Sequence, residues 1–311
     1  MTARRCLVLG GHGFIGQALT ARLVSEGHQV CVFGRPAEAR ARAPGSDGVR
    51  HIDGDFLDRD RLSSALEGAD VVFHLVSTTL PKNSNDDPAH ETATNILGTV
   101  GLLDLCVSRG VGRVVFASSG GTVYGRPLYV PLDERHPTDP VCAYGVGKLA
   151  IEKFLHLYEV LHGLSFRVLR MSNVYGPGQV PFRGQGAVAV FAYRMLRGEP
   201  VEIWGDGTVV RDHVYVADVA RAFAACMAHE GSRRIVNIGS GEGLSLNELL
   251  QRLEQIIGRR SERRYMSARR FDVPANILDV TVARDELGWR PETGLQDGLV
   301  DVVRWIGCQR F

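Results

Sequence analysis

The chain has 311 residues, 44% of them hydrophobic, so it can bury a large core in one domain or in a domain with a smaller lobe. Its formal net charge is +1, which leaves no electrostatic argument for binding nucleic acid or a membrane surface. No apolar run approaches the ~18 residues of a membrane span, and the six scattered cysteines form no CxxC pair. We therefore expect a reduced, cytoplasmic protein without a metal site or membrane insertion.

The first loop of the chain is a candidate anion-binding turn. A short apolar run, 6–9, precedes Gly10-Gly11-His12-Gly13-Phe14-Ile15-Gly16, and apolar residues at helical spacing follow. Glycines permit a tight turn and a close approach of backbone to phosphate, and a helix N-terminus favours an anion. We therefore predict a site for a dinucleotide pyrophosphate. Its candidate residues are Gly10, Gly13, Phe14, Ile15 and Gly16.

Residues after the following strands bear on the choice of cofactor. The run 30–33 is followed by Gly34-Arg35, where an acidic residue usually binds the adenosine ribose. Arg35 could pair with a 2′-phosphate, which slightly favours NADP, or be a solvated loop residue, which leaves NAD. Asp55 could accept a hydrogen bond from adenine or mark the start of a helix. Leu75 is a further candidate for the cofactor site.

The first half of the chain predicts strands that alternate with helices. The buried strands are expected at 6–9, 30–33, 71–75, 114–117 and 166–169. Helical patterns between them include 59–67, 88–109 and 143–162. This alternation, with the glycine loop after the first strand, predicts an α/β fold with a Rossmann-type, doubly wound parallel sheet.

A hydroxyl-rich turn follows the strand 114–117. Its sequence is Ser118-Ser119-Gly120-Gly121-Thr122-Val123-Tyr124-Gly125. Ligands of open α/β sheets bind at the carboxyl ends of the strands, where small hydroxyl residues can hydrogen-bond a substrate oxygen. Ser119 and Thr122 are therefore candidates for contact with a substrate.

Tyr144 and Lys148 are the sharpest candidates for catalysis. They lie four residues apart in a predicted helix and so share one face. A phenol with a pKa near ~10 is a poor base at neutral pH. A nearby ammonium and an oxidised nicotinamide would lower the pKa of Tyr144 and favour its phenolate. The chain contains only three lysines, Lys82, Lys148 and Lys153, so a chance occurrence of this spacing would be rare.

The pattern becomes irregular after about residue 173, and the elements become shorter. They are expected at 201–204, 216–229, 235–238, 245–257 and 294–306. We expect residues 1–173 to form the dinucleotide-binding domain, with some later chain returning to it. Residues 174–311 would form a smaller substrate-binding lobe, and 37–46 a mobile loop.

Together these motifs resemble the extended short-chain dehydrogenase/reductase family, in its sugar-nucleotide epimerase branch of the UDP-glucose 4-epimerase type. The glycine loop has the GxxGxxG spacing, and Tyr144-x-x-x-Lys148 matches the catalytic pair. The resemblance extends over nearly the whole chain. Further matching segments are Asn95-Ile96-Leu97-Gly98-Thr99, Arg170-Met171-Ser172-Asn173-Val174-Tyr175-Gly176-Pro177, Trp204-Gly205-Asp206-Gly207, 211–218 and 237–241.

The resemblance implies a role for individual residues. Tyr144 would be the general base and Lys148 its modulator, which also holds the nicotinamide ribose. Thr122 and Asn173 would contact the sugar or its diphosphate. Arg211, Arg269 and Asp272 would reach phosphate and ribose, for which an arginine fork is apt. Gly120 departs from the hydroxyl residue usual in 4-epimerases, so Ser119 or Thr122 must supply that contact.

The resemblance implies epimerisation at C4 of a nucleotide-linked sugar, of the UDP-hexose or UDP-N-acetylhexosamine class, through a 4-keto intermediate with bound NAD or NADP. An NADPH-dependent reductase of a nucleotide-linked 4-keto sugar is the alternative, and a non-catalytic dinucleotide-binding protein is a remote one. The family also implies a homodimer, in which the helices 88–109 and 143–162 pair across a two-fold axis. Their apolar residues exceed what one buried face needs.

Overall fold

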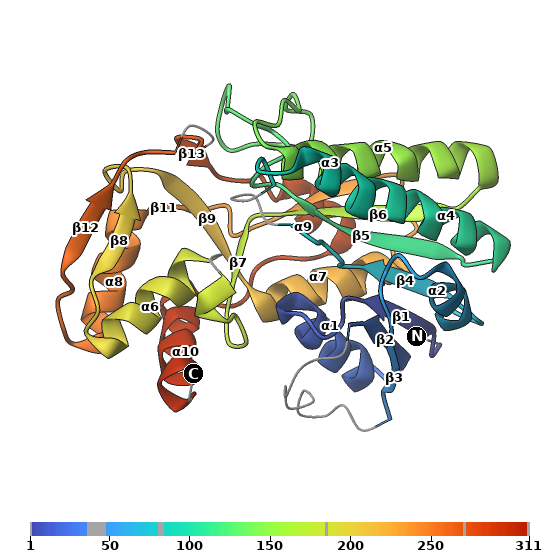
Figure 1. Ribbon diagram of the computed structural model, residues 1–311, viewed down its shortest axis with the longest axis horizontal. Helices are drawn as coiled ribbons and strands as arrows, with labels where there is room; N and C mark the ends of the chain where they lie inside the picture. Colours follow the sequence, from blue (N-terminus) through green and yellow to red (C-terminus); the bar gives the residue numbers. More distant parts are fainter. Residues whose placement is uncertain (1, 36–47, 80–83, 184–185, 270–271, 310–311) are drawn as a thin grey trace.

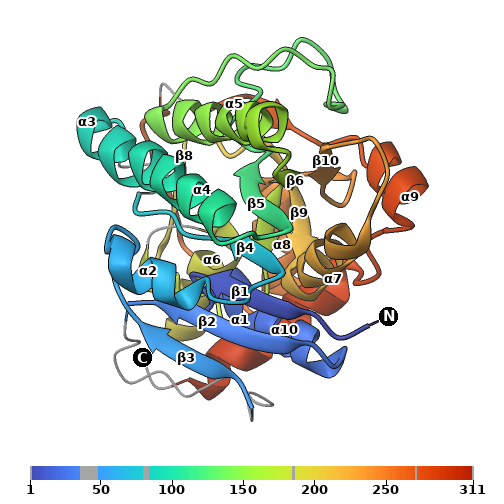
Figure 2. The ribbon, with the colours of Figure 1, turned by 90° about the vertical axis from the view of Figure 1, so that its right-hand side faces the viewer.

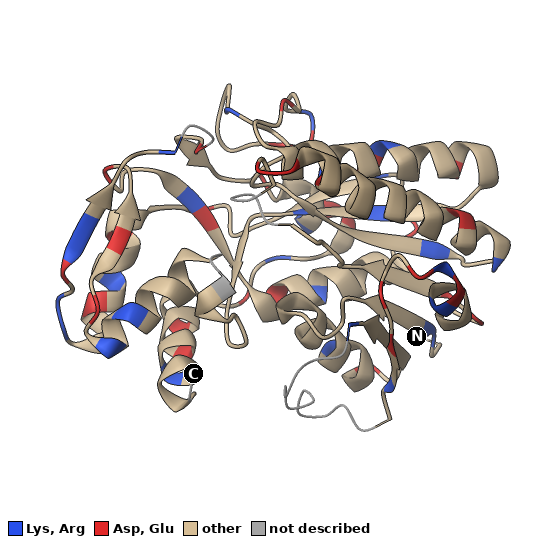
Figure 3. Cartoon of the chain, viewed as in Figure 1, with Lys and Arg blue, Asp and Glu red and all other residues tan. Residues whose placement is uncertain are grey.

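The computed structural model describes residues 2–35, 48–79, 84–183, 186–269 and 272–309. The segment 37–46, predicted as a mobile loop, lies outside these residues. Two groups of elements are visible in Figure 1: a large sheet covered by helices on both faces, and a smaller lobe beside it. Acidic and basic residues are interspersed over both (Figure 3).

The large sheet has seven strands, all parallel, in the order β10-β6-β5-β4-β1-β2-β3. Most of its residues are apolar and buried on both faces, as expected for a parallel sheet between layers of helices. The order reverses at β1, which places the switch point between β1 and β4. The strands are β1 (Arg5–Leu9), β2 (Gln29–Gly34), β3 (Arg50–Asp53), β4 (Val71–His74), β5 (Arg113–Ser119), β6 (Ser165–Met171) and β10 (Ile235–Ile238).

Helices cover the two faces of this sheet (Figures 1 and 2). One face packs against α1 (Phe14–Ser25), α7 (Val216–Ala228) and α9 (Thr281–Leu287). The other packs against α2 (Arg59–Ala65), α4 (Gly98–Ser108) and α5 (Ala143–His162). The predicted doubly wound sheet is confirmed.

The predicted helix 88–109 is divided into three segments. They are α3 (Pro88–Glu91), a π-helical turn η1 (Thr92–Leu97) and α4. A π-helical turn changes the direction in which the following side chains point, and such turns often occur at functional sites. The side chains of Glu91, Thr94 and Asn95 at this turn are buried.

The smaller lobe has a core of its own, with Leu249, Leu253 and Leu299 fully buried. Its main sheet joins β7 (Asn173–Tyr175), β9 (Val210–Tyr215), β11 (Gly243–Ser245) and β13 (Ala275–Asn276), and a separate pair joins β8 (Val201–Trp204) to β12 (Arg263–Met266). Its helices are η2 (Pro181–Arg183), α6 (Ala187–Arg197), α8 (Leu246–Ile257) and α10 (Leu295–Cys308).

The chain passes between the two groups more than once. The sequence analysis grouped 216–229 and 235–238 with the later, shorter elements. The structure places α7 and β10, which correspond to them, on the large sheet. The boundary at 173/174 between two domains stays a prediction.

Candidate active site

The glycine loop fits tightly between the first strand and α1. Gly10 has φ +80°, a backbone conformation that residues with a side chain rarely adopt. A Cβ on Gly16 would lie 2.4 Å from the Gly10 carbonyl oxygen, and one on Gly10 would lie 3.3 Å from the Leu75 backbone. Gly13 is the N-cap of α1 and uses no side chain to cap it. The amides of Phe14, Ile15 and Gly16 in the first turn are therefore suited to bind an anion. These residues fit a dinucleotide pyrophosphate.

Arg35 and Asp55 form an ion pair at the edge of this loop. The Arg35 Nε and one of its terminal nitrogens each lie 3.1 Å from Asp55 Oδ2. Both side chains are exposed, Arg35 by 74%. Asp58, not Asp55, caps α2, because its side chain accepts a hydrogen bond from the Arg61 amide. Arg35 thus has a protein partner, which would compete with a 2′-phosphate.

The hydroxyl-rich turn begins at the carboxyl end of β5. Thr122 Oγ1 is buried and has no hydrogen-bond partner in the described part of the chain, so it is available to a ligand hydroxyl. At Gly120, a Cβ would meet Leu278 at 2.7 Å and the Arg170 carbonyl oxygen at 3.1 Å. Position 120 therefore has no room for the hydroxyl residue usual in 4-epimerases, and the glycine is explained by packing.

The structure places Tyr144 and Lys148 at the start of α5, near the end of β5. The backbone amide of Tyr144 donates to Ser84 Oγ at 3.0 Å, which ties this end of the helix to the segment after β4. Lys148 is buried, and its Nζ donates to the Ala117 carbonyl oxygen at 2.9 Å. The same Nζ lies 5.4 Å from the centroid of the Tyr144 ring. The phenol and the ammonium are therefore neighbours, as predicted from their spacing.

The protein environment shifts the pKa values of Tyr144 and Lys148 in the directions that favour their neutral forms. Burial lowers the pKa of Lys148 from 10.5 to about 8, although Glu91 and Glu152 act in the opposite direction. Burial and the negative charge of Glu91 raise the pKa of Tyr144 above its ordinary value. The lowering of the pKa of Tyr144 that the sequence analysis expected is not produced by the protein alone. It would require the positive charge of an oxidised nicotinamide.

Two buried residues beneath this helix were not among the sequence candidates. Glu91 ends α3 and is only 3% exposed. Asn95 Nδ2 donates to Glu91 Oε2 at 3.0 Å. Asn95 belongs to a motif already singled out, and Glu91 precedes it by one helical turn. The sequence could have flagged Glu91 as an acid on the same helix face as that asparagine.

The remaining candidates lie in the smaller lobe. Arg211, on β9, donates to the Val273 carbonyl oxygen at 2.8 Å, and its other terminal nitrogen lies 3.8 Å from Asp272. The Arg269 guanidinium stacks 4.0 Å from the centroid of the exposed Trp204 ring. Asn173, on β7, donates from Nδ2 to the Asp212 carbonyl oxygen. The structure thus brings Arg211 and Asp272 together and places Asn173 on the strand beside β9.

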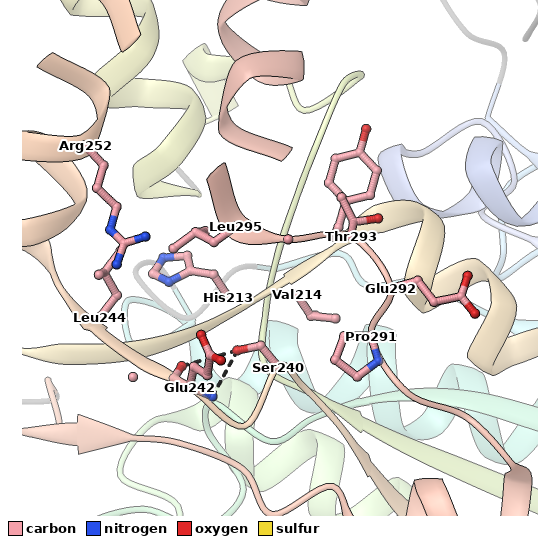
Figure 4. Close-up of a pocket in the computed structure, with 13 residues that line it drawn as sticks. His213, Val214, Ser240, Glu242, Leu244, Arg252, Pro291, Glu292, Thr293 and Leu295 are labelled. Carbon is pink, nitrogen blue, oxygen red and sulfur yellow. Dashed lines mark hydrogen bonds between the residues drawn. The ribbon is translucent and has the colours of Figure 1, made fainter. Parts of the chain in front are cut away.

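A separate pocket of about 220 Å³ lies between β9, β11 and the start of α10. Figure 4 shows His213, Arg252 and Leu295 around it. None of the predicted site residues lines this pocket. No group of three or more potential metal-ligating side chains occurs among the residues that the structure describes, and no helix there is long and apolar enough to cross a membrane.

Comparison with known proteins gives consistent results. UDP-glucose 4-epimerase of Mycolicibacterium smegmatis is 36% identical over 307 residues, which cover 97% of this chain and 98% of that protein. The structure of UDP-glucose 4-epimerase with UDP-glucose from Thermotoga maritima superposes with a TM-score of 0.92 at 36% identity, covering 97% of this chain and 98% of the other. The structure of Thermus thermophilus UDP-glucose 4-epimerase in complex with NAD superposes with a TM-score of 0.90 at 34% identity, covering 98% of this chain and 99% of the other.

Residues 6–239 match the NAD dependent epimerase/dehydratase family. This range begins in β1, contains the glycine loop and the Tyr144–Lys148 pair, and ends just after β10. Motifs, fold and similarity over the full length agree, and the chain belongs to the NAD dependent epimerase/dehydratase family.

Proposed function

We propose that this protein interconverts the C4 epimers of a UDP-linked hexose or N-acetylhexosamine. The observation that carries the proposal is the placement of Tyr144 beside the buried Lys148 at the carboxyl end of β5. The glycine loop on β1 opens at the same edge of the sheet, since parallel strands end together. The names of the similar enzymes support the choice of UDP-sugar.

The roles of the chain's own groups follow from their chemistry. Tyr144 removes the proton of the C4 hydroxyl and later returns it, which is general base and then general acid catalysis. Lys148 holds a positive charge beside the phenol and so favours the phenolate. The unpartnered Thr122 hydroxyl, with Ser119 nearby, orients the sugar hydroxyls. Arg211 and Arg269 bind the diphosphate and the nucleoside side of the substrate.

NAD is the cofactor that we assign to this site. When bound, it would supply the hydride acceptor and donor that reversible oxidation at C4 of the sugar requires. The glycine loop, with the Leu75 backbone packed against it, would hold the pyrophosphate, and Lys148 the nicotinamide ribose. The pairing of Arg35 with Asp55 weakens the argument for NADP.

The test is to incubate the purified protein separately with UDP-glucose, UDP-galactose and UDP-N-acetylglucosamine and to record NMR spectra without added reductant. Formation of the C4 epimer from at least one of them is expected. A 4-keto reductase would leave these sugars unchanged, would oxidise NADPH when given a nucleotide-linked 4-keto sugar, and would not retain nicotinamide through purification. That result would replace the epimerase assignment by the alternative.

We also propose a homodimer formed through α4 and α5. Of the apolar residues that motivated this expectation, Leu102, Leu103, Ile151 and Leu155 are buried within the chain. Other apolar side chains on the same helices are exposed, namely Val107, Val146, Leu157, Val160 and Leu161. A second copy would cover them. Light scattering at micromolar concentration should give twice the 34.0 kDa chain mass, and a constant monomer mass would exclude the dimer.

A cytoplasmic location is proposed on the state of the cysteines. All six are free thiols, and four of them are buried. Proteins of oxidising compartments more often use cysteine pairs as disulfides.

A further inference from the structure

Glu91 is a buried acid that the proposed reaction does not use. Its exposed fraction is 3%, and burial of an ionised carboxylate is costly unless donors compensate it. Oε2 accepts hydrogen bonds from Thr79 Oγ1 and from Asn95 Nδ2. The amide orientation of Asn95 is fixed, because its Oδ1 accepts from the Thr78 amide at 3.0 Å. Glu91 therefore acts as an acceptor from two donors, which is the behaviour of a carboxylate.

The other carboxylate oxygen faces the catalytic helix. A Cβ on Gly147 would lie 2.6 Å from Glu91 Oε1, so in its present position the carboxylate packs against α5 where a side chain at 147 would otherwise lie. Gly147 lies between Tyr144 and Lys148 in sequence, on the buried side of the helix. The negative charge of Glu91 acts on both: it raises the pKa of Tyr144 and opposes the effect of burial on Lys148.

A comparison with Glu152 isolates what is particular about Glu91. Glu152 also acts on Lys148, but it is already neutralised by Arg170 at 2.6 Å and accepts from Ser118. Within the described residues, Glu91 has only neutral hydrogen-bond donors and no ion pair. The charge of Glu91 is therefore less compensated than that of Glu152 and has the larger effect on the pKa of Lys148.

The other ionisable groups around the pair do not replace Glu91. His74, on β4, is held neutral because burial lowers its pKa to about 3. Cys142, before α5, is held as a thiol because burial raises its pKa. Arg170, on β6, is engaged by Glu152. Lys153 and Glu159 lie farther along α5, more than one helical turn beyond Lys148.

We propose that Glu91 is a positioning residue whose carboxylate, seated against Gly147, keeps Lys148 protonated beside Tyr144. A lysine buried here without a counter-charge would lose its proton near neutral pH and with it the ability to favour phenolate. The role in proton transfer rests on the proposed function, whereas the effect on the charge of Lys148 does not.

The test compares the wild-type protein with Glu91→Gln, which keeps an oxygen for Thr79 and Asn95 but removes the charge. Lysine labelled with ¹³C at Cε reports the protonation of Lys148 directly. Because the chain has three lysines, Lys82→Arg and Lys153→Arg suffice to assign the signals. The titration midpoint of Lys148 should fall by roughly one pH unit, the size of shift that a neighbouring charge produces.

Three further variants separate electrostatics from structure. Glu91→Asp keeps the charge and should restore a midpoint near that of wild type. Glu91→Met removes the charge without adding an amide that lacks a partner, and it serves if the glutamine variant folds poorly. Glu159→Gln is the control for distance. It removes one charge from α5, the helix that carries Lys148, roughly 16 Å farther along, where Glu159 pairs with Arg234 at 2.6 Å, and it should leave the Lys148 midpoint unchanged.

The pH profile of kcat/KM provides the second measurement. Both limbs should move to lower pH in Glu91→Gln, since loss of a negative charge lowers the pKa of Tyr144 and of Lys148 alike. An unchanged Lys148 titration in the neutral variants would overturn the proposal. If the Lys148 midpoint falls in Glu91→Gln as expected but the wild-type protein epimerises no UDP-sugar, the proposed function fails and the effect of Glu91 on the charge of Lys148 stands.

Discussion

The glycine loop and the start of α5 lie at the same edge of the large sheet, but they are built by different physical means. The loop is held by backbone contacts at the limit of van der Waals approach, with Gly16 and Gly10 in mutual contact. The start of α5 is held by buried charge, in Lys148 and Glu91. Substitutions in the loop should therefore act through sterics and be insensitive to pH. Substitutions on α5 should change electrostatics, and their effects should depend on pH.

The largest effect is expected at Tyr144. Tyr144→Phe removes the group that carries the proton, and we expect a loss of at least ~10²-fold in rate, typical of losing a general acid or base. NAD affinity and thermal stability should remain close to wild type, because the ring is kept. Turnover within a few-fold of wild type would show that another group moves the proton.

In the loop, Gly16→Ala should lower the free energy of unfolding by about 1–3 kcal/mol, the usual cost of overpacking. The added methyl meets the Gly10 carbonyl oxygen at 2.4 Å, whereas at Gly13 the corresponding distance is 3.1 Å. Gly13→Ala should therefore be nearly as stable as wild type without ligand and lose mainly NAD affinity. Chemical denaturation and calorimetric titration of both variants measure the two effects. Equal stability of the two variants would contradict the steric account.

Lys148→Met should inactivate the enzyme and yet stabilise it at pH 7. The pKa of this lysine is about 8 in the folded protein and 10.5 in the unfolded chain, so its burial as an ammonium destabilises the fold below pH 8. Allowing for the lost hydrogen bond to Ala117, we expect a net gain of about 1–2 kcal/mol. The gain should shrink as the pH rises from 8 to 10.5. Denaturation curves across this range test it, and a gain independent of pH would point to packing instead.

The smallest effect is expected at Arg35, on the exposed side of the loop. Arg35→Ala breaks an exposed ion pair with Asp55, a kind of interaction that contributes about 0–1 kcal/mol. Affinity for NAD should change by less than about fivefold, which corresponds to that range. If binding of NADP falls far more than binding of NAD, Arg35 contacts a 2′-phosphate after all.

The elements with a clear period were predictable from the sequence, and α5 (Ala143–His162) and β10 (Ile235–Ile238) have the predicted bounds. The pairing of Arg35 with Asp55 could also have been inferred, because both follow the ends of strands that lie side by side. The placement of α7 on the large sheet could not, since it depends on contacts between distant segments. Its spacing from Asn95 could have flagged Glu91 as a buried acid, but the proximity of Glu91 to α5 arises only in the folded chain.

The direction of the pKa shift of Tyr144 illustrates a further limit. Sequence spacing shows which charges are near, here Lys148, but not how much water is excluded around them. In the folded protein, desolvation of the phenol and the charge of Glu91 raise the pKa of Tyr144, although Lys148 lies beside it. Whether a neighbouring charge lowers or fails to lower a pKa therefore depends on the packing of the site. The glycine at position 120 likewise depends on packing, because Leu278 leaves no room there for a side chain.

The return of the chain from the smaller lobe to the large sheet has a consequence for synthesis on the ribosome. Until residue 238 has emerged, β6 has an unpaired edge, because its neighbour β10 is the last strand of the large sheet to be made. The apolar side chains of Val8 and Leu19 likewise lack their partners on α7, which are Val219, Phe223 and Met227. A nascent chain ending near 173 would carry an incomplete sheet that is prone to aggregation. The segments of the smaller lobe that precede β10, from β7 to β9, must therefore be made before the large sheet can be completed, and we expect the chain to need chaperones most during that interval.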